Sequence, residues 1–163
     1  MRKSLEVFCL AALAWISWIT YQAVYGPDHL PARIPTHFDM AGNPNGWGSP
    51  AGLLLLPIIA LAIYVFMTVI ALFPSTFHFS MPVTAENRPR LEALAIRVIA
   101  LCKVEMLCLF LWIQHAIIEA ARSPQQTFAA TGYLIPVFVV VILGTVGWHV
   151  LAMYRAARPG AEM

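Results

Sequence analysis

Two pairs of residues in this sequence carry side chains suited to metal binding or proton transfer. One pair, His37 and Asp39, lies in a polar segment rich in proline and glycine. The other pair, His115 and Glu119, is spaced four residues apart in an apolar run, so both side chains project from one face of a helix. Imidazole and carboxylate groups bind Zn²⁺ and other transition metals. The four residues therefore form a hypothetical divalent-metal or proton site, with the alternative that His37 only anchors its segment.

Spacings typical of enzymes are absent from the sequence, which contains no HExxH motif, no Ser-His-Asp pattern and no phosphate-binding glycine loop. Cys9, Cys102 and Cys108 lie in apolar runs without CxxC spacing, which is typical of small buried hydrophobic residues. The sequence thus favours a binding protein over an enzyme. We expect no cofactor apart from the divalent metal, such as zinc, just considered.

The polar segment His29–Pro50 separates two apolar runs, and its prolines and glycines disfavour a helix. Its candidate ligand- or partner-binding residues are Pro35, His37, Phe38, Asp39, Gly42 and Trp47. We expect the segment to form an ordered cap on the helix ends. Ile34 and Phe38 gain free energy by burial, and the ring of Trp47 suits the headgroup region of a bilayer.

Composition indicates a membrane protein. Hydrophobic residues make up 60% of the chain, charged residues 11%, and the mean hydropathy is +0.74, whereas a soluble domain has about 25% charged residues. Four runs reach the length of about 20 residues that crosses a bilayer as a helix. These runs are Leu5–Tyr25, Gly52–Phe73, Leu91–Ile118 and Tyr133–Tyr154. The sequence therefore predicts an all-α integral membrane protein with four transmembrane helices and an ordered extracytoplasmic loop between helices 1 and 2.

The third run differs from the others because it contains ionisable residues. The candidate intramembrane polar residues are Arg97, Glu105, His115 and Glu119. Each charge near the midplane costs about 2.5–3.5 kcal/mol, so we expect a polar stripe that faces the bundle, with Lys103 and Gln114 on another side of the helix. Two interpretations remain open. In the first, Arg97 and Glu119 extend to the two membrane surfaces and Glu105 is hydrogen-bonded in the bundle. In the second, the stripe lines a functional polar cavity.

Basic residues are distributed unevenly among the predicted connections. One side would carry Arg2, Lys3, Arg88, Arg90, Arg155 and Arg158, and the other only Arg33 and Arg122. By the positive-inside rule both termini are cytoplasmic and His29–Pro50 is external, in a plasma membrane of bacterial type. The net charge of +2 is too small to suggest a nucleic-acid partner.

We expect one packed domain made of two halves. Residues 1–73 comprise helix 1, an external loop of residues 26–51 and helix 2; residues 74–163 comprise helix 3, at about 90–120, and helix 4, at about 133–155. The expected partners are the lipid bilayer and a secreted peptide or another membrane protein, and an oligomer is compatible with this arrangement.

The external loop resembles a known signature. The order Ile34-Pro35, His37-Phe38, Gly42 and then Trp47-Gly48-Ser49 is similar to the IP-x-HF…G…WGS pattern of a domain of unknown function. That domain forms the N-terminal part of SdpI-like membrane proteins, and the resemblance covers about the first 70 residues. It implies a multi-pass membrane fold and a relationship to an immunity protein that also holds a transcriptional repressor at the membrane.

Two classes of function follow. The first is an immunity- or sensor-like binding module whose external loop engages a peptide, a lipid or a membrane partner. The second is a small membrane enzyme or carrier that uses a metal or proton site at the outer end of helix 3. We favour the first, because Phe38, Trp47 and the prolines suit a preorganised recognition surface.

Overall fold

The computed structural model describes residues 2–39, 41–124 and 133–158, and the connection between the third and fourth helices lies mostly outside them. The long helices are α1 (Arg2–Tyr25), α2 (Leu55–Ile70), α3 (Arg88–Arg122) and α4 (Leu134–Ala156). The remaining elements are strands β1 (Ile34–Phe38) and β2 (Pro44–Gly48) and the short 3₁₀ helices η1 (Pro50–Leu54) and η2 (Pro74–Thr76).

Three helical segments are long and apolar enough to cross a membrane: Lys3–Tyr25, Pro50–Ile70 and Leu134–Ala156. They indicate a membrane protein, as the composition predicts. The structured part of the chain offers no fourth segment of this kind, and α3, which contains several ionisable residues, is not among the three. Whether α3 also crosses the bilayer must therefore be judged from its position beside the other helices.

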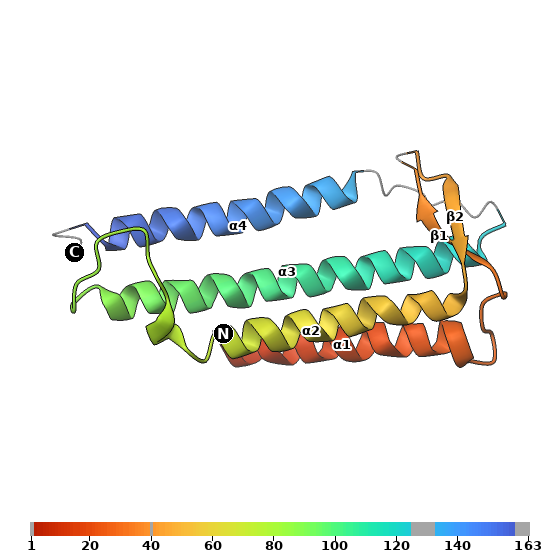
Figure 1. Ribbon diagram of the computed structural model, residues 1–163, viewed down its shortest axis with the longest axis horizontal. Coiled ribbons are helices and arrows are strands. Elements are labelled where there is room, and N and C mark those ends of the chain that lie inside the picture. Colours follow the sequence, from red (N-terminus) through yellow and green to blue (C-terminus); the bar gives the residue numbers. More distant parts are fainter. Residues whose placement is uncertain (1, 40, 125–132, 159–163) are drawn as a thin grey trace.

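The central helix of the bundle is α3 (Figure 1). Helices α1 and α2 lie along one side of it and α4 along the other, and α1 begins and α4 ends at the end away from the hairpin. Apolar residues of α1, α2 and α3 form one core, which includes Cys9, Leu13, Ala60 and Leu107. Among the helices, α4 has its main contact with α3, and most of its surface is exposed.

The polar segment between α1 and α2 contains an antiparallel hairpin, so the expected all-α fold is wrong in this detail. Ile34 pairs with Gly48 and Phe38 with Pro44, with irregular register near His37. Gly42 reverses the chain with a φ of 83°, a conformation that favours glycine. The strands show no clear alternation of apolar and polar residues in the sequence. Pro35 and Pro44 also lack the N–H groups that a regular ladder uses, and proline is therefore found mainly in edge strands.

The hairpin is anchored to the helix ends by apolar residues. Leu30 and Ile34 are buried in a core formed with Ala23 of α1, Leu53 of η1 and Ile118 of α3. Phe38 is half-buried, and Trp47 remains 41% exposed. Ile34 is thus buried against the helix ends, while an ordered cap and its resistance to hydrogen exchange stay predictions.

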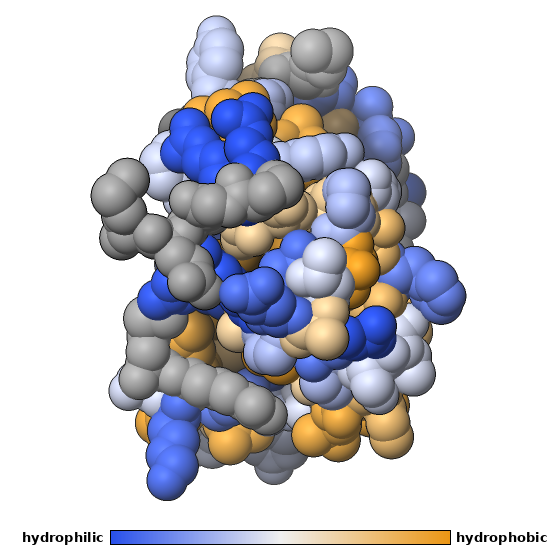
Figure 2. Space-filling model, turned by 90° about the vertical axis from the view of Figure 1, so that its left-hand side faces the viewer, coloured by the Kyte–Doolittle hydropathy of each residue, from blue (hydrophilic) through white to orange (hydrophobic). Residues whose placement is uncertain are grey.

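At the opposite end of the bundle, α2 and α3 are joined by residues 71–87. Met81 from this connection packs with Leu91 and Ala95 of α3 and with Met153 of α4. Figure 2 looks onto this end, where hydrophilic residues lie among apolar ones. The ends of the helices here include the exposed basic residues Lys3, Arg90, Arg155 and Arg158.

Candidate functional site

Asp39 holds the turn of the hairpin. Its Oδ1 accepts hydrogen bonds of 2.9 Å from the backbone N–H groups of both Ala41 and Asn43, and its Oδ2 accepts one of 3.3 Å from the Asn43 side chain. The backbone hydrogen bond from Asn43 is the main cause that lowers the pKa of Asp39 below its usual value. This carboxylate therefore has a structural role within its own turn.

The other candidate residues of the hairpin also make contacts within it. The Nδ1 atom of His37 is hydrogen-bonded to Oδ1 of Asn45 on the opposite strand. A Cβ atom at position 46 would lie 2.8 Å from the His37 Cβ, so glycine is required opposite the imidazole. The Arg33 guanidinium lies 5.7 Å from the centre of the Trp47 ring, which is cation–π geometry. Pro35 is buried, and Gly42 makes the turn.

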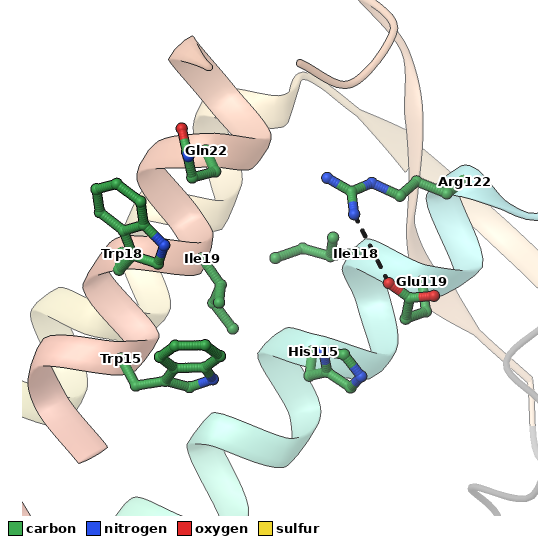
Figure 3. Close-up of a pocket in the computed structure, with 8 residues that line it drawn as sticks. All are labelled: Trp15, Trp18, Ile19, Gln22, His115, Ile118, Glu119 and Arg122. Atoms are coloured by element: carbon green, nitrogen blue, oxygen red, sulfur yellow. Dashed lines mark ion pairs between the residues drawn. The ribbon is translucent and has the colours of Figure 1, made fainter. Parts of the chain in front are cut away.

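A cleft of about 210 Å³ lies between α1 and α3 (Figure 3). Four residues from each helix line it, with the same spacing of i, i+3, i+4 and i+7 that marks one helix face. They are Trp15, Trp18, Ile19 and Gln22 from α1, and His115, Ile118, Glu119 and Arg122 from α3. The two helices thus present one apolar and aromatic wall and one wall with ionisable groups.

The ionisable groups of the cleft are only loosely engaged. Nη1 of Arg122 and Oε1 of Glu119 are 3.8 Å apart, and their side chains are 47% and 56% exposed. Figure 3 shows the Arg122 side chain extending from α3 toward α1 above Ile118, with Glu119 beside it and His115 a turn below. An exposed pair of this kind contributes little to stability, about 0–1 kcal/mol, so both charges are available to a ligand.

The structure brings only half of the predicted metal ligands to this cleft. His115 and Glu119 line it, whereas His37 and Asp39 do not. Within residues 2–39, 41–124 and 133–158, no three His, Cys, Asp or Glu side chains lie close enough to hold a metal ion together. The hydrogen bonds described above turn the Asp39 carboxylate into its own loop.

Glu105 lies between α3 and α4. The Thr145 hydroxyl of α4 donates a hydrogen bond of 2.5 Å to its Oε1, while its Oε2 is buried without a hydrogen-bond partner in the described part of the chain. Arg97, by contrast, is exposed, so the expectation that it faces the bundle is wrong. The reason is that α3 has neighbours on two opposite sides, and the line through Arg97 and His115 runs between them.

The buried polar residues of α3 are Lys103 and Gln114. Helical periodicity places both on another side of the helix from the predicted polar stripe. Lys103 is 2% exposed, and its Nζ donates hydrogen bonds to Oε1 of Glu6 at 2.6 Å and to the Thr68 hydroxyl at 3.0 Å. The Tyr64 hydroxyl of α2 donates to the other oxygen of Glu6 at 3.1 Å. This cluster joins α1, α2 and α3 through residues far apart in the sequence.

Gln114 makes a second buried connection nearer the hairpin. Its Nε2 donates to the Thr20 hydroxyl of α1 at 2.6 Å and to the Leu53 carbonyl of η1 at 3.0 Å. Sequence reasoning missed the role of Glu6, Lys103 and Gln114. The available signal was that Glu6 and Lys103 are opposite charges in apolar runs, where each needs a partner.

Comparison with known proteins adds a family match over part of the chain. Among curated proteins and solved structures, the comparison found no match. The matched region takes in most of α1, the hairpin with its IP-x-HF and WGS residues, and the beginning of α2. Residues 7–61 match a domain of unknown function, DUF1648.

Proposed function

We propose that this protein is a membrane binding protein that takes its ligand in the cleft between α1 and α3. The observation that carries the proposal is the state of the polar side chains. Asp39 and His37 are hydrogen-bonded within the hairpin, and Lys103 and Gln114 within the bundle. In the cleft, the contact found for Arg122 among the described residues is a loose ion pair with Glu119. The cleft therefore retains the charges that a ligand can use.

The position of α3 supports four membrane crossings. Helix α2 ends and α3 begins at one end of the bundle, and α4 begins at the other (Figure 1). If α1, α2 and α4 cross a bilayer, α3 must cross beside them, and its 35 residues span about 52 Å. Its buried Lys103 is neutralised by Glu6, which lowers the cost of placing that charge in the membrane.

The same arrangement supports an orientation in the plasma membrane. Basic residues such as Arg90 and Arg158 gather at the end with the termini, which the positive-inside rule assigns to the cytoplasm. The hairpin and the cleft are then at the external side. An immunity- or sensor-like role, as the resemblance to SdpI-like proteins implies, agrees with a ligand that arrives from outside or from the outer leaflet.

Cysteine labelling tests the topology. With a membrane-impermeant reagent on intact cells, Asn45→Cys in the hairpin should react, and Arg158→Cys should react only after permeabilisation. The parent chain measures the background from Cys9, Cys102 and Cys108, which are buried or half-buried. The reverse pattern would refute the orientation and place the cleft on the cytoplasmic side.

Protection of the cleft tests the binding function even while the ligand is unidentified. Ile19→Cys introduces a thiol on the α1 wall, and Tyr21→Cys places one on an exposed position of α1 outside the cleft. We expect Ile19→Cys to react more slowly in native membranes than in nanodiscs of pure phosphatidylcholine. Tyr21→Cys should show the same rate in both. Equal rates for Ile19→Cys in the two membranes would refute the proposal.

A further inference from the structure

We propose that the ligand of the cleft between α1 and α3 is the headgroup of an aminophospholipid, with its phosphate on Arg122 and its primary ammonium on Glu119. This inference rests on the binding function proposed above and names the class of ligand. It assigns one partner to each of the two opposite charges that α3 presents at the cleft.

The first argument is where the cleft opens. Its α1 wall belongs to Lys3–Tyr25, one of the segments apolar enough to cross a membrane. Trp15 and Trp18 are 56% and 54% exposed, so this wall faces outward from the bundle into the surrounding lipid. Each indole ring combines an apolar surface with an N–H that can donate to a polar group of a lipid in the cleft. A molecule that enters from this side comes from the bilayer.

The second argument is charge complementarity. Arg122 and Glu119 are separated by 3.8 Å between their nearest charged atoms and are about half exposed, so a ligand can take the place of their weak mutual attraction. A guanidinium binds phosphate oxygens through paired N–H groups, and a carboxylate accepts N–H bonds from an ammonium. A zwitterion with one phosphate and one primary amine satisfies both residues at once.

The third argument is size. A cleft of about 210 Å³ lies below the range of about 300–1,000 Å³ that holds whole drug-sized molecules. It suits a headgroup, while the acyl chains would lie outside the cleft along the apolar surface of α1. Ile19 and Ile118, which line the cleft from its two sides, provide the apolar contact for the glycerol region.

Native mass spectrometry of the purified full chain in detergent tests the assignment. The probes are phosphatidylethanolamine, phosphatidylcholine, phosphatidylglycerol, soluble phosphoethanolamine and inorganic phosphate. We expect phosphatidylethanolamine to bind most tightly. Arg122→Gln should weaken the binding of all three phospholipids by about tenfold, because a hydrogen bond to a charged group is lost.

Glu119→Gln tests the contact with the ammonium separately from the contact with the phosphate. This variant should weaken phosphatidylethanolamine binding and leave phosphatidylglycerol, which has no amine, unchanged. Arg33→Gln is the matched control, because Arg33 is an exposed arginine on the connection to the hairpin that does not line the cleft. This control should bind all lipids as the parent does, and unchanged elution of each variant from a sizing column verifies its fold.

Three outcomes would overturn the inference. If Arg122→Gln bound lipids as the parent does, Arg122 would not be the residue that binds the phosphate. Binding of inorganic phosphate or soluble phosphoethanolamine as tight as that of the lipid would indicate a free anion as the ligand. Finally, Ile19→Cys protected in native membranes but not in phosphatidylethanolamine nanodiscs would retain the binding function and indicate another ligand, such as a secreted peptide.

Discussion

The hairpin and helix α3 both carry polar side chains, and these side chains find their hydrogen-bond partners in different ways. In the hairpin, partners are close in sequence: Asp39 bonds to Asn43, and His37 to Asn45. For the buried polar residues of α3, the partners come from other helices: Lys103 bonds to Glu6, and Gln114 to Thr20. Local partners shape a turn, whereas distant partners hold the helices together.

This comparison distinguishes polar groups that are engaged in structural hydrogen bonds from polar groups that could bind a ligand. A polar residue with a short-range partner, such as Asp39, looks functional in the sequence because it stands out in a membrane protein, yet its lone pairs are already used. On α3, Arg122 and Glu119 face a cleft, and within the part of the chain that the structure describes they form a loose pair with each other. This difference is why we propose that ligand binding occurs at the cleft between α1 and α3.

The largest expected effect comes from the buried ion pair. Glu6→Leu leaves the Lys103 ammonium, 2% exposed, without its carboxylate. We expect the free energy of unfolding in mixed detergent to fall by about 3–5 kcal/mol, because the remaining charge is buried and unpaired. The double variant Glu6→Leu/Lys103→Met should recover most of the loss.

The matched control for this pair is Arg88→Met. Arg88 pairs with Glu92 at 2.9 Å within α3, but its side chain is 43% exposed. This surface pair should contribute less than about 1 kcal/mol. Equal losses for Glu6→Leu and Arg88→Met would contradict the view that buried partners from different helices hold the bundle together.

A smaller loss is expected at Gln114. Gln114→Leu removes the donor to the Leu53 carbonyl and the Thr20 hydroxyl, and we expect a destabilisation of about 1–3 kcal/mol from the buried acceptors left without it. Thr20→Val should cost less, because Gln114 then keeps its bond to Leu53. A reversed order of the two losses, measured in the same unfolding assay, would show that η1 does not depend on this side chain.

Changes in the hairpin should remain local. Asp39→Ala removes the acceptor for the amides of Ala41 and Asn43, so hydrogen exchange at these two positions should speed up a few-fold. The unfolding free energy of the bundle should stay the same, as it should for Asp28→Ala, an exposed aspartate outside the hairpin. A fall in the unfolding free energy of the bundle in Asp39→Ala would contradict the view that the hydrogen bonds of the hairpin act only locally.

The smallest expected effect is a pH dependence of the same turn. The pKa of Asp39 is lower in the folded hairpin than in an unfolded chain, so its contribution is fully present above the unfolded value of about 3.9. It is lost as the pH falls through the lower folded value. Exchange protection at Asn43, corrected for intrinsic rates, should decline in that acidic range. The decline should be absent in Asp39→Asn.

The sequence predicted the helices better than the site. Long apolar runs mark α1, α2 and α4, because only length and hydropathy are needed to recognise a membrane segment. The strands escaped recognition because prolines interrupt them. On α3, helical periodicity correctly grouped Arg97 with His115, but it could not tell which side of the helix the neighbours occupy.

The sequence by itself determined that the chain is a membrane protein and that a proline- and glycine-rich segment interrupts its helices. Both follow from composition and local backbone preference. Only the tertiary structure decided which polar groups are used. Placing α3 between the α1–α2 pair and α4 buried Lys103 against Glu6, turned Glu105 to Thr145 and left Arg122 at an open cleft. Such pairings depend on packing between distant segments, which no local pattern encodes.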